Sequence, residues 1–562
     1  MTVPVAERGA ARQRLRGIGH AAVLIGVITV LARVVGFGRQ VVFAHTVGST
    51  CAGTAYTTAN MVPNIIYDVV LGGALSSVVV PVLAGSAGRS GAQARQISSA
   101  LLTWTVLLLA PVSVAVAAAA RPVVSVLLGG THGCLRPGLI DVSSRMLAVF
   151  APQILLYGLA VVLYGILQAQ RRFGAPALAP LVSSVVLIAT YGAFGAVGGQ
   201  YVNRLASLPA GAALLLSGGT TLGVLALVLT AVVPLARLHL RRRRAGGQHA
   251  GPWLPRPVLR FPQDVGARVR RLAVAGVLTL VAQDASAVVV IVLANRHGGV
   301  GALVLYGFAW AVFVVPYAVL AVPIATSAFP ELSKRSDDFD ATSAGSTRAV
   351  LLASWLGAAA LAGTRVPVAR VFESHSVSSA STLAVALAAF APGLIGYGLA
   401  ANLSRVLYAL GHSRSPALAV SGGWLLVIAA DAVIVPLVPR ERVVPALGLG
   451  TSIGLTVAGV ALLVLVLRAR GGAALAGGLR AAVAGFVGCV AGVLAGSAVS
   501  VALHVSGFFP NVGVSVLACA AVGVAFLLVV MAADVGDLRA TARRLRARAS
   551  LRARASLWAR AR

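Results

Sequence analysis

Acidic residues are scarce in this sequence of 562 residues. It contains 14 Asp and Glu against 46 Lys and Arg, only 11% of its residues are charged, and its mean hydropathy is +0.92. A soluble domain of this size needs a more polar surface than such a composition supplies. The chain is therefore predicted to be an all-α protein that crosses a membrane many times.

Catalytic and metal-binding patterns are also missing. The sequence has no HExxH, CxxC or phosphate-binding loop, and no Ser, His and Asp arrangement that suggests nucleophilic catalysis. We therefore predict a protein that is not an enzyme and holds neither a metal nor a prosthetic cofactor. Of the four cysteines, Cys489 and Cys519 lie in apolar segments. Cys51 and Cys134 fall on one side of the membrane in the topology below; a disulfide is an alternative there to the favoured interpretation as unpaired thiols.

Long apolar runs dominate the amino-acid sequence. Runs of about 20 residues or more predict membrane-spanning helices, and the N-terminal arginines before the first run resemble a signal-anchor that is retained as the first helix. Fourteen spans are predicted. They cover residues 20–44, 53–83, 97–120, 139–169, 174–197, 209–236, 272–295, 301–329, 347–371, 379–410, 415–438, 443–467, 481–503 and 510–534.

The basic residues indicate how these spans are oriented. With the N-terminus inside, and with residues near the end of a span counted in the adjacent loop, 34 of the 46 Lys and Arg lie on the inner side, nine on the outer side and three (Arg33, Arg39 and Arg405) deeper within spans. This asymmetry predicts cytoplasmic N- and C-termini. The formal net charge of +32 therefore indicates topology signals and contact with anionic lipids, because basic patches interleaved with aromatics are missing and no nucleic-acid partner is expected.

An internal repeat indicates two lobes. Residues 150–179 align without gaps on residues 390–419, with 14 of 30 positions identical. The offset equals six predicted helices, so the halves are parallel repeats that can enclose a cavity for alternating access. Two lobes in one chain need no second copy, and a functional monomer is expected. The predicted segments are an N-terminal lobe (1–236), a basic cytoplasmic linker (237–271), a C-terminal lobe (272–468), two further helices (478–534) and a basic cytoplasmic tail (535–562).

Two arginines lie within the first span. An arginine near the bilayer centre costs roughly 3 kcal/mol unless it faces water or a partner. Arg33 and Arg39 are six residues apart, about 120° around a helix, so both can border one wide cavity. A guanidinium binds phosphate oxygens with two parallel hydrogen bonds, which suits a phosphate-bearing substrate. In the alternative, Arg39 reaches one interface and Arg33 pairs with Asp68.

Carboxylates within the spans are the second group of candidates. Asp68 follows Pro63-Asn64 in the second span, and Asn64 and Asp68 are predicted to line or gate the cavity. Asp284 and Asp431 lie in the second half and, with the hydroxyl of Thr451, suggest a site for Na⁺ or H⁺ as coupling ion. The alternative for Asp431 is a helix cap near the outer surface.

These residues resemble the MurJ/MviN family, the proposed lipid II flippases of the multidrug/oligosaccharidyl-lipid/polysaccharide exporter superfamily, in an actinobacterial form. The stretches that carry the resemblance are Ala32 through Arg39, Val62-Pro63-Asn64, Phe150-Ala151-Pro152 through Pro180, and Pro316 through Phe329-Pro330-Glu331-Leu332-Ser333.

The resemblance implies a V-shaped transporter in the bacterial cell membrane that serves peptidoglycan biosynthesis. It would move lipid II, an undecaprenyl-pyrophosphate glycopeptide, from the inner to the outer leaflet. Arg33 and Arg39 match the arginines thought to bind the pyrophosphate, and the last two helices would hold the lipid tail. Asp284, Asp431 and Thr451 occupy counterparts of a proposed cation site.

The sequence departs from the family at three positions of the cavity. Tyr67-Asp68 replaces an arginine pair, Gly72 replaces an acidic residue, and Ala311 replaces an arginine. Fewer positive charges would weaken phosphate binding, so a flippase for another polyprenyl-linked glycan, or a small-molecule exporter of the MATE type, is kept as the alternative.

Overall fold

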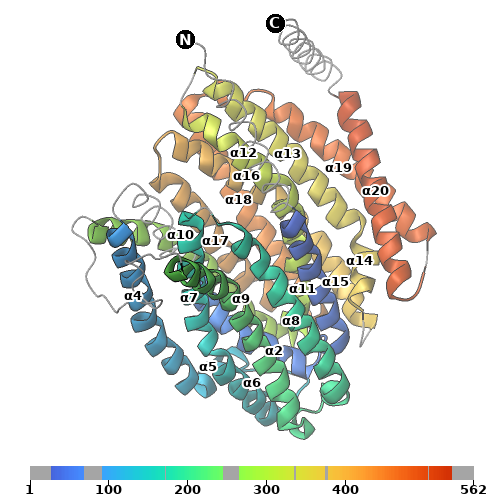
Figure 1. Cartoon of the computed structure of the whole chain (residues 1–562). Helices are drawn as coiled ribbons and strands as arrows, with labels where there is room; N and C mark the ends of the chain where they lie inside the picture. The colour runs from blue at the N-terminus through green and yellow to red at the C-terminus, as the bar shows by residue number, and fades with distance from the viewer. Residues whose placement is uncertain are drawn as a thin grey trace, which may run out of the picture. The chain divides into compact units, whose positions relative to one another are not determined.

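The computed structural model describes residues 27–68, 91–170, 172–244, 265–334, 337–373, 377–503 and 505–533. Within these ranges all regular structure is helical, as predicted (Figure 1). The longer helices, after a first helix at Val27–Thr46, are α2 (Cys51–Tyr67), α4 (Gly91–Ala118), α5 (Ala120–Leu127), α6 (Arg136–Phe150), α7 (Pro152–Ala169), α8 (Gly174–Gly198), α9 (Ala210–Arg244), α10 (Val265–Leu293), α11 (Ala302–Pro316), α12 (Val322–Ser333), α13 (Phe339–Gly363), α14 (Arg365–Val371), α15 (Val377–Phe390), α16 (Gly393–Ala409), α17 (Arg414–Ile434), α18 (Val443–Arg470), α19 (Gly478–Ala502) and α20 (Phe508–Ala533).

The predicted spans correspond to these helices. In the described ranges, 12 helices are long and apolar enough to cross a membrane, and α15 with α16 forms one further span bent by 43°. The bend lies at Ala391-Pro392, where proline lacks the N–H that would continue the helix. The predicted span 53–83 is described only in its first part, as α2. The count of fourteen is thus an approximate one.

The chain forms two compact units. The first comprises residues 1–308, 372–382 and 424–450, and the second comprises residues 309–371, 383–423 and 451–562. The linker and tail that are predicted to be cytoplasmic, together with Gly72 and the residues before Val27, lie largely or wholly outside the described residues. The predicted segment boundaries and the orientation in the membrane stay predictions.

The internal repeat is visible as a repeated aromatic pair. Tyr157 and Tyr397 occupy equivalent positions of the repeat. The Tyr157 ring lies 4.5 Å from that of Tyr67 in the first unit, and the Tyr397 ring lies 3.8 Å from that of Tyr317 in the second, between ring centroids. In each half of the sequence, the second predicted span thus makes the same aromatic contact with the fourth predicted span.

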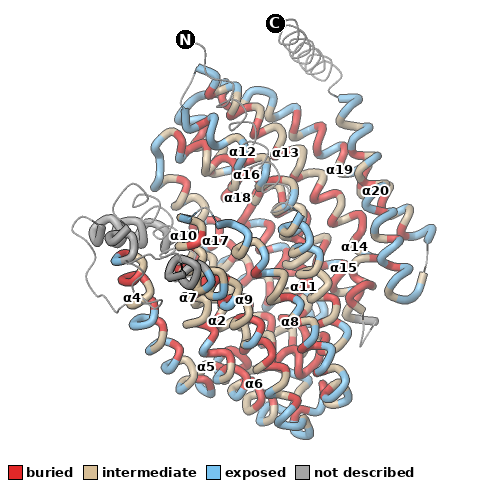
Figure 2. Tube along the Cα trace, in the orientation of Figure 1, coloured by how far each residue is buried: buried red, intermediate tan, exposed pale blue. Residues whose placement is uncertain are grey.

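In the second unit, α19 and α20 lie side by side along α13 (Figure 1). Only a narrow stripe of each is buried (Figure 2). The exposed large hydrophobic residues of the chain include many from these two helices. Glycines form the buried stripe of α19, and a Cβ at Gly496 would meet Val522 Cγ2 of α20 at 2.6 Å. Such close packing through small residues is typical of helices in lipid, where apolar side chains are stable facing outward.

The expectation that all four cysteines are unpaired is wrong. Cys51, at the first residue of α2, forms a disulfide with Cys134, in the loop between α5 and α6, and their Cα atoms are 6.0 Å apart. Cys489 and Cys519 are free thiols. The sequence places the two bonded residues 83 positions apart, and no local pattern indicates that the intervening helices bring them together.

Candidate functional site

The first helix carries both candidate arginines, in two different surroundings. Arg33 is exposed, and the neighbouring Val30 and Val34 are also more than half exposed. Arg39 is half-buried, and its Nε atom is fully buried without a hydrogen-bond partner in the described part of the chain. A buried guanidinium nitrogen that is left unpaired is costly, which makes Arg39 a candidate for contact with an anionic ligand.

Three tyrosines of the first unit, Tyr56, Tyr157 and Tyr191, lie within electrostatic range of Arg39. The Tyr56 and Tyr191 hydroxyls are 2.8 Å apart, and the Tyr56 hydroxyl is 3.0 Å from Thr220 Oγ1. The neutral hydroxyls of Tyr56, Tyr191 and Thr220 hydrogen-bond to one another, so they form a polar surface, here called the tyrosine wall, that does not cancel the positive charge of Arg39.

Asn64 and Asp68 lie at the C-terminal end of α2. The Tyr157 hydroxyl donates to Asn64 Oδ1 at 3.2 Å, which fixes the orientation of that amide. Asp68 is half-buried. No ion pair joins Arg33 to Asp68, two residues that the structure describes, so the alternative pairing of these residues is not observed.

Asp284 brings a second carboxylate to the same unit. It lies on α10 with 5% of its surface exposed, and its Oδ2 atom is buried without a partner in the described residues. Asp68 lies close enough for the two carboxylates to interact electrostatically. Two neighbouring carboxylates repel each other unless a proton or a cation neutralises one of them.

Asp431 lies on α17 and is fully buried. Neither carboxylate oxygen has a hydrogen-bond partner in the described ranges, so the side chain does not cap a helix there. Gly450 of α18 packs so closely that a Cβ at this position would collide with Asp431 Oδ1. Thr451, the next residue, is also fully buried and belongs to the second unit.

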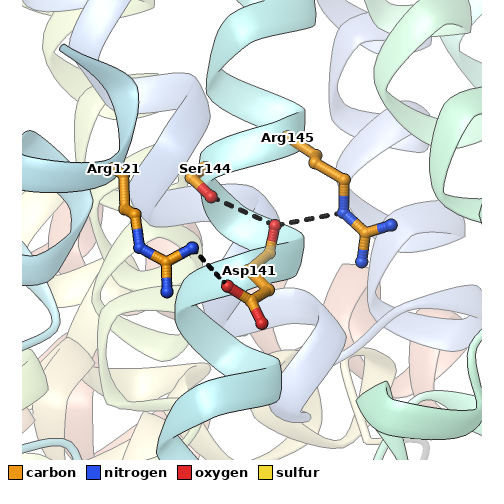
Figure 3. A network of polar contacts seen from close by, with 4 residues as sticks. All are labelled: Arg121, Asp141, Ser144 and Arg145. Atoms are coloured by element: carbon orange, nitrogen blue, oxygen red, sulfur yellow. Dashed lines mark hydrogen bonds and ion pairs between the residues drawn. The ribbon is translucent and has the colours of Figure 1, made fainter.

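A different polar network lies on the surface of the first unit. Arg121 Nη1 donates to Asp141 Oδ1 at 2.8 Å, and the Asp141 carbonyl accepts from Ser144 and from Arg145 (Figure 3). The side chains of the ion pair are 72% and 44% exposed, and exposed pairs contribute little stability. This network provides arginines that serve as controls for those of the first helix. In the described part of the chain, no three His, Cys, Asp or Glu side chains form a metal-binding group.

Sequence reasoning missed several residues of this site. Gly450 is one of 62 glycines, and nothing near it in the sequence indicates contact with a carboxylate. The phenols of Tyr56 and Tyr191 read as ordinary residues of apolar helices. For Tyr157, its place in the repeat was the available signal.

Comparisons with known proteins agree with this architecture. The family model described as "Lipid II flippase MurJ" matches residues 43–520. A probable lipid II flippase MurJ of Synechocystis is 26% identical over 71% of this chain and 73% of its own length. The lipid II flippase MurJ of Burkholderia cenocepacia is 26% identical over 80% of this chain and 84% of its own length.

Solved structures share the fold. One titled lipid II flippase MurJ in an inward closed conformation gives a TM-score of 0.69 at 17% identity and covers 91% of this chain and 98% of its own. An inward-facing MATE-family transporter gives 0.59 at 13% identity, with 79% and 94% covered. Since the family model spans most of the sequence, the chain belongs to the lipid II flippase MurJ family.

Proposed function

We propose that this protein moves lipid II from the inner to the outer leaflet of the bacterial cell membrane by alternating access. The observation that carries the proposal is Arg39, a half-buried guanidinium with an unpaired Nε, in a chain of the MurJ family. The proposal places both termini in the cytoplasm, as the Lys and Arg distribution indicates, and needs neither catalysis nor a second copy of the chain.

Binding of the pyrophosphate is assigned to Arg33 and Arg39. Arg39 would hold phosphate oxygens from its protected position, while the exposed Arg33 would meet the ligand before Arg39 does. The tyrosine wall supports this role, because its mutually bonded hydroxyls leave the charge of Arg39 available. Asn64 and Asp68 would line the path beside them.

Coupling to a cation is assigned to Asp284, Asp431 and Thr451. Buried carboxylate oxygens without hydrogen-bond donors fit Na⁺, which prefers oxygen ligands, and they equally fit protonation. Asp68 is a further half-buried carboxylate of the same compact unit as Asp284. We propose this site as the source of drive for transport.

The test of the binding role uses a purified protein and a short-chain polyprenyl pyrophosphate glycopeptide. Arg39→Ala should weaken binding at least tenfold, because charge-assisted hydrogen bonds contribute about 1.5–3 kcal/mol each. Arg39→Lys, which keeps the charge and loses the planar fork, should recover part of that loss. Arg145→Ala removes an exposed arginine and is the matched control. Equal affinities for the Arg39→Ala and Arg145→Ala variants would contradict the assignment.

A flippase for another polyprenyl-linked glycan is the second candidate. Asp68 stands beside the site where family members have arginine, and an added negative charge disfavours a highly anionic headgroup. Competition binding with polyprenyl pyrophosphates that carry different glycans separates the two. Preference for a ligand without the pentapeptide would favour this candidate.

A further inference from the structure

One end of the first unit is cross-linked in a way that substrate binding does not require. The Cys51–Cys134 disulfide joins the start of α2 to the loop between α5 and α6. The neighbouring connections meet at the same end: the amide of Ala52 donates to the Val202 carbonyl at 2.8 Å, and the amide of Cys51 donates to Asn203 Oδ1 at 3.2 Å. In the predicted orientation this end faces the outer side.

The turn between α10 and α11, residues 294–301, is docked on the two segments that the disulfide joins. Asn295 is fully buried, and its Nδ2 atom donates to Thr58 Oγ1 and to the Leu127 carbonyl, each at 3.1 Å. The amide of Gly301 donates to Thr54 Oγ1 at 2.8 Å. The remaining hydrogen bond runs from the amide of Val300 to the His132 carbonyl at 3.2 Å. The turn therefore binds α2 and residues 127–132 simultaneously.

Close backbone approaches make this docking sensitive to the spacing of its two partners. Gly301 has φ +79°, and a Cβ there would meet the Ser49 carbonyl oxygen at 2.5 Å. Gly299 has φ +76°, and its Cβ would lie 3.1 Å from the His132 carbonyl oxygen. Both positions favour glycine for conformation and for space. If α2 and the 128–135 loop moved slightly apart, the 294–301 turn could keep its hydrogen bonds to only one of them.

We infer that the disulfide holds together the receiving surface of an outer latch, and that the 294–301 turn is the latch. The inference rests on the proposed function in one respect, namely that transport requires this end to open and close. Asn295 is the positioning residue, since it bonds to both halves of the receiving surface. Loss of the disulfide lets α2 and the loop move apart, and the latch then opens more often.

The disulfide can be tested in the folded protein because a reductant can reach it. Cys51 is buried, but Cys134 is half-buried and both His132 and Leu135 beside it are exposed. Reduction by a trialkylphosphine breaks the S–S bond and gives two thiols, while the phosphine becomes its oxide with oxygen from water. A background variant, Cys489→Ser/Cys519→Ser, removes the free thiols and prevents exchange between disulfides.

The readout is hydrogen–deuterium exchange of the full chain in lipid nanodiscs. After reduction, the amides of Val300 and Gly301 should exchange about tenfold faster, the change expected when the protection of roughly one net hydrogen bond is lost. Peptides of α13, in the other unit, should be unchanged. Complete reduction, verified by thiol labelling, with unchanged exchange of the turn would overturn the inference.

Two variants sharpen the experiment. Cys51→Ser/Cys134→Ser should reproduce the effect of phosphine and make the phosphine inactive, whereas a further phosphine effect in that variant would contradict the assignment. Asn295→Ala should accelerate amide exchange of the turn even without reduction. Reduction of the disulfide should then add a smaller further increase in that exchange than it does in the wild type. Amide exchange can be measured without lipid II, so the two proposals fail separately. Faster exchange of the turn after reduction, in a chain that does not transport lipid II, would contradict only the proposed function. Lipid II transport by a chain in which reduction leaves the exchange of the turn unchanged would contradict only the latch.

Discussion

Replacing Gly450 by alanine should weaken cation binding at Asp431. The Cβ of alanine would collide with Asp431 Oδ1, so either the carboxylate or the two helices must shift. Overpacking of this kind costs about 1–3 kcal/mol. If the displaced group is the cation ligand, that cost corresponds to a roughly 5- to 150-fold weaker cation affinity.

The affinity is measured from the unfolding temperature of the purified protein, titrated with NaCl against choline chloride at constant ionic strength, and separately with pH. A cation that binds only the folded state stabilises it by RT ln(1 + c/Kd) at a free cation concentration c, so the dependence of the unfolding temperature on cation concentration gives the affinity. Gly422→Ala is the matched control, because a Cβ at Gly422 of α17 has no neighbour within 4 Å. The reasoning is refuted if Gly450→Ala keeps the wild-type titration midpoint for both ions.

Three further changes have defined outcomes. Asn295→Ala should destabilise the docked 294–301 turn by about 2 kcal/mol, since two hydrogen bonds are lost, and amide exchange of the turn should accelerate accordingly. Tyr157→Phe leaves Asn64 without its donor and should lower the transport rate while the unfolding temperature changes little; an unchanged rate would remove Asn64 from the path. Arg121→Ala breaks an exposed ion pair with Asp141, so stability should change by less than about 1 kcal/mol and transport should be unaffected.

Segment length and apolarity predicted the helical fold well, because a helix in lipid must be long and apolar whatever it packs against. Arg33, Arg39, Asp284 and Asp431 were recognisable for the same reason, since a charge within a span is costly. The repeat was visible because 14 of 30 aligned positions are identical, and the structure shows that the repeated Tyr157 and Tyr397 make the same aromatic contact in each half.

Features that depend on three-dimensional proximity could not be predicted in this way. The Cys51–Cys134 disulfide and the contact of Gly450 with Asp431 join segments whose spacing in the sequence carries no signal. The different surroundings of Arg33 and Arg39 depend on which face of the first helix the tyrosines cover. Helical periodicity gives the angle between two residues but does not say which side is occupied.

The central claim is that this chain exports lipid II through the arginines of its first helix. The most direct measurement is the amount of lipid II on the surface of cells depleted of their own flippase and supplied with the wild-type chain or with Arg33→Ala/Arg39→Ala, at equal expression. The account predicts that the wild type restores surface lipid II and the double variant does not. Equal restoration by both, or none by a well-expressed wild type, would contradict it.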